Sequence, residues 1–259
     1  MAEKKWNAAR PERAAADENL IEGRNAVTEA LRSGRTIDKV YVAAGETDRA
    51  LSRLAAQAKE AGAVVVTVDR RKLNSMSQTG AHQGIMAVTA AHEYASVDDI
   101  LQRAEKKGQA PLIVICDELT DPHNLGAIIR TAECAGAHGV IIPKRHSVGL
   151  TAVVSKTSAG ALEYMPVARV TNITNTMKEL QKRGIWIFGT AASGTVDLYH
   201  ADLKGPAAIV IGNEGDGMSR LVSESCDFMV SIPMRGEISS LNASAAAAIM
   251  LYEAVRQRG

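Results

Sequence analysis

The chain has 259 residues, of which 46% are hydrophobic and 23% are charged. These proportions are typical of globular proteins and exclude a disordered, fibrous or coiled-coil chain. The formal net charge of +1, from 30 basic and 29 acidic residues, excludes a histone-like protein but leaves nucleic-acid binding open, because such binding depends on a local basic patch.

The first part of the chain predicts a short basic tail and then a small α/β domain. We assign residues 1–16 to the tail, because Lys and Arg alternate there with Ala and Glu without steady periodicity. Residues 17–92 form the first predicted domain, and residues 93–108 a linker rich in charge that ends in Gly108. The predicted elements are helices at 24–33, 49–61 and 73–77 and strands at 38–43, 63–68 and 85–89.

The rest of the chain, residues 109–259, predicts a second and larger domain. Continuous apolar runs indicate strands at 112–116, 139–142, 164–167, 185–190, 207–211 and 228–232. Helices are predicted between them, at 125–136, 151–160, 173–183, 219–225 and 241–257. Strands that alternate with helices favour an α/β fold with a mostly parallel sheet covered on both faces.

The cysteines and the apolar runs bear on compartment and metal binding. The three cysteines are odd in number, far apart and outside any CxxC pair, so we expect reduced thiols in a cytoplasmic protein, without a disulfide framework or a zinc site. Residues 1–17 carry charges without an apolar core, so we expect no secretory signal. We expect no membrane span either, because no apolar run approaches about 20 residues.

Three polar loops each follow a predicted strand, where ligands of parallel α/β sheets bind. In the first, residues 117–130, Asn124 is predicted to cap the following helix, and Arg130 is open to either a surface or a functional role. His123 has no partner at metal-ligand spacing, so we assign no metal site. In the second loop, residues 209–220, Glu214 stands among three glycines whose spacing matches neither a dinucleotide fingerprint nor a P-loop.

The third loop, residues 232–244, joins a strand to the last helix. Ser239 or Ser240 is a candidate cap of that helix, whereas Asn242 and Ser244 are candidates for facing a ligand. The sequence leaves these two interpretations open.

Taken together, the three loops resemble the motifs of the SpoU/TrmH family of RNA ribose 2′-O-methyltransferases, in the SPOUT superfamily. The matching segments are DPHNLGAIIRTAECAG, IVIGNEGDGMS and IPMRGEISSLNASAAAAIMLYE. The first domain resembles that of the RlmB-type subgroup, through IEGRNAVTEAL and HQGIMA. One departure is small: Ala243 and Ala245 stand where many members carry Val.

The resemblance implies an S-adenosylmethionine-dependent enzyme that is a homodimer and whose catalytic domain contains a deep trefoil knot. It implies a ribosomal-protein-like first domain that binds RNA and a guanosine ribose of large-subunit (23S) ribosomal RNA as substrate. The implied catalytic residues are Arg130, Asn124, Glu214 and Asn242. The expected donor contacts lie at Thr190, Gly212, Ile232 and Leu241. Candidates for RNA phosphate contact in the first domain are Arg24, Arg35, Arg70, Arg71 and Lys72.

Three alternatives remain at this point. Two have the same chemistry, a transfer-RNA 2′-O-methyltransferase and a methyltransferase that confers resistance by modifying ribosomal RNA. The third is a non-catalytic RNA-binding factor for ribosome assembly, against which the intact polar residues of the three loops argue.

Overall fold

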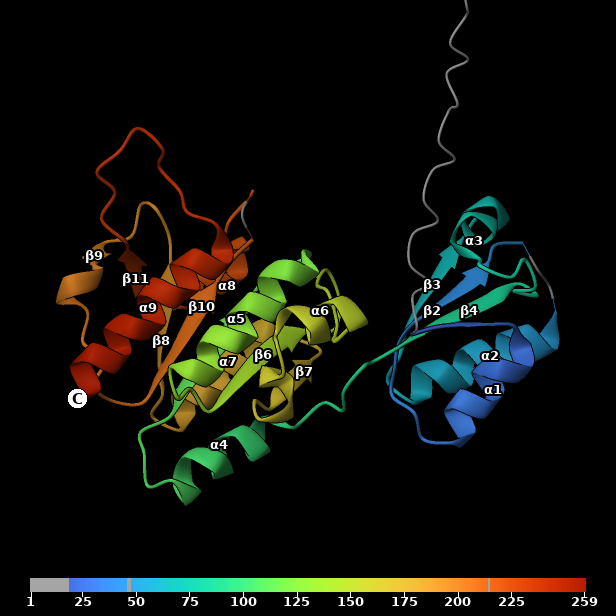
Figure 1. The fold of residues 1–259 in the computed structure, drawn as a ribbon, viewed down its shortest axis with the longest axis horizontal. Coiled ribbons are helices and arrows are strands. Elements are labelled where there is room, and N and C mark those ends of the chain that lie inside the picture. Colours follow the sequence, from blue (N-terminus) through green and yellow to red (C-terminus); the bar gives the residue numbers. More distant parts are fainter. Residues whose placement is uncertain (1–18, 46–47, 214) are drawn as a thin grey trace, which may run out of the picture.

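Two units, each built on its own β-sheet, make up the computed structural model of the chain (Figure 1). The structure describes residues 19–45, 48–213 and 215–259, so the predicted tail at 1–16 lies outside the described residues. Within those ranges, no helix is both long and apolar enough to cross a membrane.

The first unit has a four-stranded sheet in the order β1-β4-β2-β3, with helices on both faces. Its elements are β1 (Leu20–Glu22), α1 (Arg24–Arg32), β2 (Ile37–Ala43), α2 (Arg49–Glu60), β3 (Val64–Val68), α3 (Arg70–Met76) and β4 (Ile85–Thr89). Strand β2 pairs parallel with β3 and antiparallel with β4. Val27 of α1 and Leu51 of α2 pack in one core cluster, whereas Leu73 of α3 packs in another.

The second unit has a seven-stranded sheet in the order β7-β6-β5-β10-β8-β11-β9. All of its strand pairs are parallel. Its first elements are α4 (Val97–Lys106), β5 (Leu112–Cys116), α5 (Pro122–Cys134), β6 (Gly139–Pro143), α6 (Ala152–Thr157), η1 (Ala161–Glu163), β7 (Val167–Val170) and α7 (Ile173–Lys182). The later ones are β8 (Trp186–Thr190), β9 (Val196–Asp197), η2 (Leu198–His200), β10 (Ala207–Ile211), α8 (Arg220–Glu224), β11 (Phe228–Ser231) and α9 (Ala243–Arg258).

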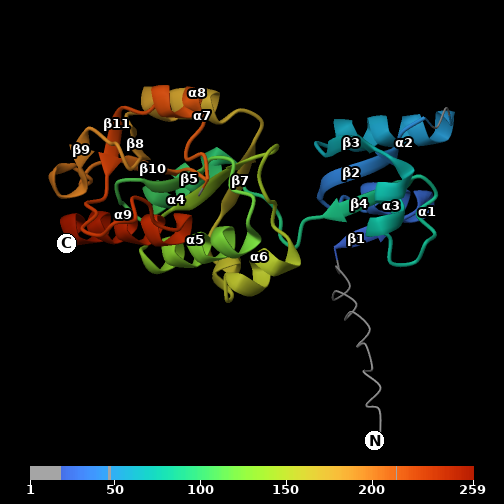
Figure 2. The same cartoon turned by 90° about the horizontal axis from the view of Figure 1, so that it is seen from above.

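Helices cover both faces of this sheet, as the continuous apolar runs predict. Every residue of β5 is buried. Leu112 and Val114 face a core cluster shared with α5 and α9, whereas Ile113 and Ile115 face a cluster shared with α4 and α7. Successive side chains of a strand point to opposite faces, so both faces need a covering layer. Figure 2 shows α5, α6 and α9 on one side of the sheet and α7 and α8 on the other, which confirms the α/β fold class.

Several segments differ from the sequence-based expectation. The short strands β1 and β9 were not predicted. The segment 93–108, assigned to a linker, contains helix α4, which opens on a capping box between Ser96 and Asp99. Ile100 of this helix is fully buried in the core of the second unit. The strand predicted at 164–167 is wrong: β7 spans Val167–Val170, because a short 3₁₀ turn at Ala161–Glu163 still belongs to the preceding helical segment.

A buried histidine in this unit predicts that stability falls in mild acid. The Nδ1 atom of His138 accepts a hydrogen bond from the backbone N–H of Leu112 at 3.0 Å. Burial, and to a smaller extent nearby cations such as Lys107, lower the pKa of His138 from 6.5 to about 4. The unfolded chain therefore binds more protons between these pH values, and folding stability decreases as pH falls through that window.

We expect this histidine to cost about 2 kcal/mol of unfolding free energy between pH 7 and pH 5. Urea unfolding at both pH values measures the change. The variant His138→Asn should lose less unfolding free energy between pH 7 and pH 5, because its amide does not titrate. Replacement of the exposed His200 should leave the acid loss of the wild type unchanged. An equal acid loss in wild type and His138→Asn would contradict the assignment.

Candidate active site

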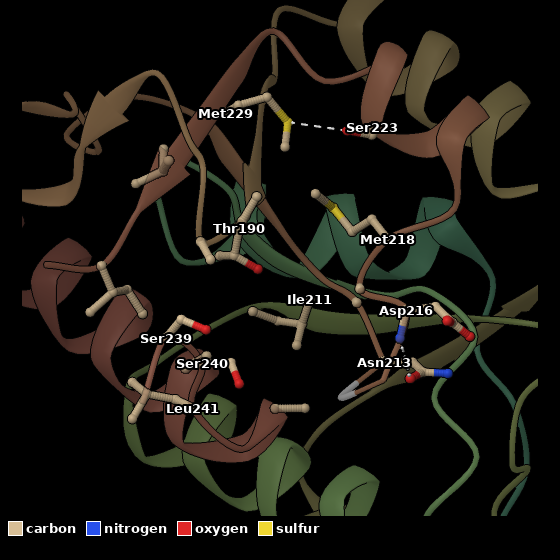
Figure 3. A pocket seen from close by; sticks show the side chains of 18 of the residues that line it. Thr190, Ile211, Asn213, Asp216, Met218, Ser223, Met229, Ser239, Ser240 and Leu241 are labelled. Atoms are coloured by element: carbon tan, nitrogen blue, oxygen red, sulfur yellow. Dashed lines mark hydrogen bonds between the residues drawn. The ribbon is translucent and has the colours of Figure 1, made fainter. Parts of the chain in front are cut away.

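A cavity of about 470 Å³ opens at the carboxyl ends of β8, β10 and β11 (Figure 3). The loops that follow these strands line it together with the start of α9. All four predicted donor-contact residues are among its lining residues: Thr190, Gly212, Ile232 and Leu241. The loops after β8, β10 and β11 therefore meet at the carboxyl edge of the sheet, where parallel α/β sheets bind their ligands.

The glycine-rich loop after β10 is held by its own backbone. The N–H groups of Asn213 and Gly217 each donate to the carbonyl oxygen of the other residue at 3.0 Å. The side-chain oxygen of Asn213 accepts from the N–H of Gly215 at 2.6 Å. A Cβ atom at Gly212 would lie closer than 3.0 Å to the backbone of Gly217 and Met218. Glycine is thus required at 212 by the close approach of the two arms of this loop.

Sequence reasoning missed Asp117, which connects the first loop to the second. This residue follows β5 directly and is 3% exposed. Its Oδ2 atom accepts a hydrogen bond from the backbone N–H of Ser219 at 2.7 Å, across 102 positions of sequence. A buried carboxylate needs such a donor, because burial without a hydrogen bond is costly. A charged residue directly after an apolar strand was the available signal.

Asn124 and Asn242 meet next to the cavity. The side-chain nitrogen of Asn242 donates to the side-chain oxygen of Asn124 at 2.9 Å, and Asn124 is 7% exposed. Asn242 also caps α9, because its side-chain oxygen accepts from the N–H groups of Ser244 and Ala245. The expected cap by Ser239 or Ser240 is therefore wrong, and so is that by Asn124, since Asp121 caps α5. The asparagine pair connects the beginning of α5 to the beginning of α9.

The structure does not bring all four candidate catalytic residues together. Arg130 is exposed on α5, and the described residues that line the cavity do not include it. Glu214 lies outside the described residues. The catalytic assignment of Arg130 and Glu214 therefore stays a prediction from the sequence.

The cavity suits an organic ligand with both apolar and polar parts. Its apolar walls include Ile211, Met218 and Ile232, and the hydroxyl groups of Ser239 and Ser240 border it. The hydroxyl of Thr190 donates to the carbonyl oxygen of Val210 at 2.8 Å, so it faces a ligand only as an acceptor. A concave site that combines apolar walls with placed polar groups is typical of small-molecule sites.

Cys116 and Cys226 do not suit thiol chemistry, and no metal site is indicated among the described residues. Burial raises the pKa of Cys116 to about 12, and burial with nearby Asp227 raises the pKa of Cys226 to about 12. Such thiols are poor nucleophiles, because only the thiolate reacts readily. No group of three or more His, Cys, Asp or Glu residues in the described ranges is arranged to hold a metal ion.

Among the basic residues proposed for RNA contact, Arg24 already has protein partners. Its guanidinium forms an ion pair with Asp48, and its Nε donates to the backbone oxygen of Gln83 at 3.2 Å. Arg35, Arg70, Arg71 and Lys72 are all exposed. Their exposure makes these four side chains accessible to phosphate groups.

Two protein-family models match the chain, one for each unit. Residues 111–252 match the SpoU rRNA methylase family. Residues 20–95 match the family described as RNA 2′-O ribose methyltransferase substrate binding. A Bacillus subtilis protein named as a TrmH family tRNA/rRNA methyltransferase, YacO, is 49% identical over 93% of this chain and 96% of its own length. A protein of the same description from Staphylococcus aureus is 45% identical over 93% of this chain and 97% of its own length.

Solved structures show the same fold. The SpoU methyltransferase AviRb from Streptomyces viridochromogenes, in complex with AdoMet, is 29% identical with a TM-score of 0.59, covering 92% of this chain and 90% of that one. The AdoMet-bound rRNA methyltransferase from Sinorhizobium meliloti is 27% identical with a TM-score of 0.58, and the alignment covers 92% of this chain and 86% of that one. A TrmH/SpoU tRNA modifying enzyme from A. aeolicus is 30% identical with a TM-score of 0.53, and the alignment covers 61% of this chain and 84% of that one.

Proposed function

Because this chain belongs to the SpoU family of RNA methyltransferases, which use S-adenosylmethionine, we propose that it methylates the ribose 2′-hydroxyl of a guanosine in large-subunit (23S) ribosomal RNA. The observation that carries the proposal is the match of residues 20–95 to a family described as binding the substrate of RNA 2′-O ribose methyltransferases. That match supports both the class of substrate and the position of the methylated atom.

The coverage of related structures favours ribosomal RNA over transfer RNA. The rRNA methyltransferase from Sinorhizobium meliloti aligns with 92% of this chain, whereas the tRNA modifying enzyme from A. aeolicus aligns with 61%. Transfer RNA stays the second candidate, because the relatives from Bacillus subtilis and Staphylococcus aureus are named as tRNA/rRNA methyltransferases.

The residues of the cavity fit S-adenosylmethionine. The volume of about 470 Å³ lies within the range of small-molecule sites. Met218, Ile232 and Leu241 offer an apolar wall for an adenine ring, and Ser239 and Ser240 offer hydroxyl groups to polar parts. When bound, the donor supplies a methyl group on a positively charged sulfur. The geometry supports donor contacts at Thr190, Gly212, Ile232 and Leu241.

The residues of the chain must then orient the ribose and stabilise the charge that develops on its 2′-oxygen. We assign that stabilisation to Arg130, whose guanidinium has a pKa above about 12 and therefore stays protonated. The hydrogen bond between Asn124 and Asn242 holds the helices α5 and α9 in register beside the cavity. Glu214 is proposed, from the sequence alone, to orient Arg130 or to receive the proton through water.

We also propose a homodimer with a knotted catalytic unit, located in the cytoplasm. Two apolar side chains on one turn of α9, Ile249 and Tyr252, are 37% and 52% exposed. An exposed apolar stripe on a helix is typical of an interface between subunits. The knot and the cytoplasmic location rest on the family resemblance and on the unpaired cysteines.

In the decisive experiment, the purified protein is incubated with methyl-labelled S-adenosylmethionine and either ribosomal RNA or transfer RNA. We expect label in the large-subunit RNA, recovered as 2′-O-methylguanosine after digestion to nucleosides. Label in transfer RNA alone would overturn the choice of substrate. Label on a base, and not on a ribose, would overturn the proposed reaction.

Removing the first unit should separate donor binding from RNA selection. Because α4 belongs to the core of the second unit, the shortened chain has to begin before Ser96 and not near Gly108. We expect this chain to bind S-adenosylmethionine like the full chain, measured by calorimetry, but to lose most methylation of ribosomal RNA. Methylation of the same nucleotide at full efficiency by the folded, shortened chain would contradict a role of the first unit in substrate selection.

A further inference from the structure

Three side chains from different parts of the chain meet between the two units. Asp38 belongs to β2 of the first unit, Arg169 to β7 of the second, and Tyr94 to the segment between them. The guanidinium of Arg169 forms an ion pair with Oδ1 of Asp38 and also donates to its backbone oxygen at 2.9 Å. The hydroxyl of Tyr94 donates to Oδ2 of Asp38 at 3.0 Å. Both carboxylate oxygens of Asp38 therefore bond to groups outside its own unit.

Tyr94 completes the cluster by contacting the second unit in two further ways. Its hydroxyl accepts a hydrogen bond from the backbone N–H of Leu150 at 2.9 Å. The guanidinium of Arg169 lies over its ring, 5.1 Å from the centroid. A cation above an aromatic ring is attracted by the negative face of the ring. Each member of the cluster thus contacts both of the others.

The cluster is buried, so it contributes more to the orientation of the two units than to their stability. The side chains of Arg169 and Asp38 are only 7% and 9% exposed. A buried ion pair contributes little net stability, because the cost of removing two charges from water offsets their attraction. Its directional bonds nevertheless favour one arrangement of the two surfaces, since any other arrangement leaves a buried charge without its partner.

The backbone at Gly149 passes so close to the cluster that only glycine fits there. A Cβ atom at Gly149 would lie closer than 3.0 Å to Oδ2 of Asp38 and to the hydroxyl oxygen of Tyr94. Two backbone hydrogen bonds flank the cluster, from Ala90 to Thr36 at 2.9 Å and from Ala91 to Leu150 at 2.6 Å. The first unit, the connecting segment and the second unit are therefore joined at one small contact.

We infer that Asp38, Tyr94 and Arg169 are positioning residues that hold the first unit at one orientation to the cavity and so determine which ribose of a bound RNA reaches it. The inference rests on the proposed function, because it takes the first unit as the RNA-binding one. Contacts with phosphate groups fix the register of an RNA on that unit. The distance and angle from there to the cavity then select the nucleotide that is methylated.

The first experiment measures the orientation without any reaction, in the full chain. One spin label is attached to the exposed Cys134 of α5 and a second to a cysteine that replaces the exposed Lys59 of α2. Cys116 is buried and Cys226 is only partly exposed, and both are replaced by serine so that they take up no label. Dilution with unlabelled protein restricts the measured distances to those within one chain.

We expect one narrow distance distribution in the wild type and a broad one in Asp38→Asn and in Gly149→Ala. Gly149→Ala separates the units without removing a charge, so it stays informative if Asp38→Asn unfolds. Tyr94→Phe keeps the ring over Arg169 and should broaden the distribution less. The matched control is Asp98→Asn, which removes an exposed ion pair with Arg183 at 2.7 Å and should change nothing.

The second experiment measures methylation by the same variants. We expect the KM for RNA to rise by about tenfold or more, with added methylation at neighbouring nucleotides, since small misplacements of a substrate have large effects on rate. The affinity for S-adenosylmethionine should not change, which distinguishes positioning from loss of structure.

A narrow distribution in both Asp38→Asn and Gly149→Ala would overturn the inference, and so would a broad one with unchanged KM and an unchanged methylation site. If the wild type methylates no RNA, the proposed function fails, whereas the distance measurement still reports on the cluster.

Discussion

Replacing Arg130 by alanine should lower methyl transfer by about a hundredfold or more, because it removes a charge that stabilises the developing alkoxide. The affinity for S-adenosylmethionine should stay the same, since the described residues that line the cavity do not include Arg130. The exposed position of Arg130 on α5 leaves its guanidinium accessible to an RNA chain. A turnover assay and calorimetry with the donor, run on the same preparation, measure the two quantities.

Two further variants sharpen this test. Arg130→Lys keeps a positive charge but loses the planar fork, so a stabilising role predicts activity between those of wild type and Arg130→Ala. Arg183→Ala is the matched control, because it removes an exposed arginine from the end of α7, on the other face of the sheet. A loss of less than about tenfold in Arg130→Ala would be too small for a charge that stabilises the transition state.

Gly212→Val should abolish donor binding. The new Cβ atom would lie closer than 3.0 Å to the backbone of Gly217 and Met218, so the loop after β10 must move. Because this loop lines the cavity, we expect the affinity for S-adenosylmethionine to fall by about a hundredfold or more. Calorimetry measures the affinity, and circular dichroism checks that the variant is folded.

The control for this prediction is Gly205→Val, just before the opposite end of β10. A Cβ atom there would meet no atom within 4 Å, so the same substitution should leave donor binding intact. Unchanged affinity in a folded Gly212→Val protein would show that the loop after β10 does not form the donor site.

Local sequence patterns predicted most of the architecture. Buried strands of a parallel sheet are continuous apolar runs, so the strands Leu112–Cys116 and Ala207–Ile211 were predicted with their observed bounds. The linker was placed at α4, despite the helical periodicity of the segment, because the segment ends in charged residues and Gly108; the burial of Ile100 shows that this helix belongs to a core. Strand β7 was placed too early because Tyr164 and Met165 continue the apolar run, although the strand starts only after Pro166.

The site was predicted less completely, because its contacts join residues that are distant in sequence. The family resemblance implied Thr190, Gly212 and Leu241 as donor contacts, and these residues line one cavity because loops that follow parallel strands meet at one edge of the sheet. The hydrogen bond of Asn124 with Asn242 spans 118 positions, and no local pattern indicates it. For Asp117, a charged residue directly after an apolar strand was a local signal, but its partner is a backbone N–H, which no side-chain pattern indicates.

The position of β10 has a consequence for how the protein is made. This strand lies between β5 and β8, both of which leave the ribosome before it. Until Ala207–Ile211 is synthesised, β5 and β8 have no strand between them, and each presents an unpaired edge. Pairings between distant segments form slowly, and exposed edges promote aggregation during that time. The second unit therefore completes its sheet late in translation, and the nascent chain depends on protection of those edges until then.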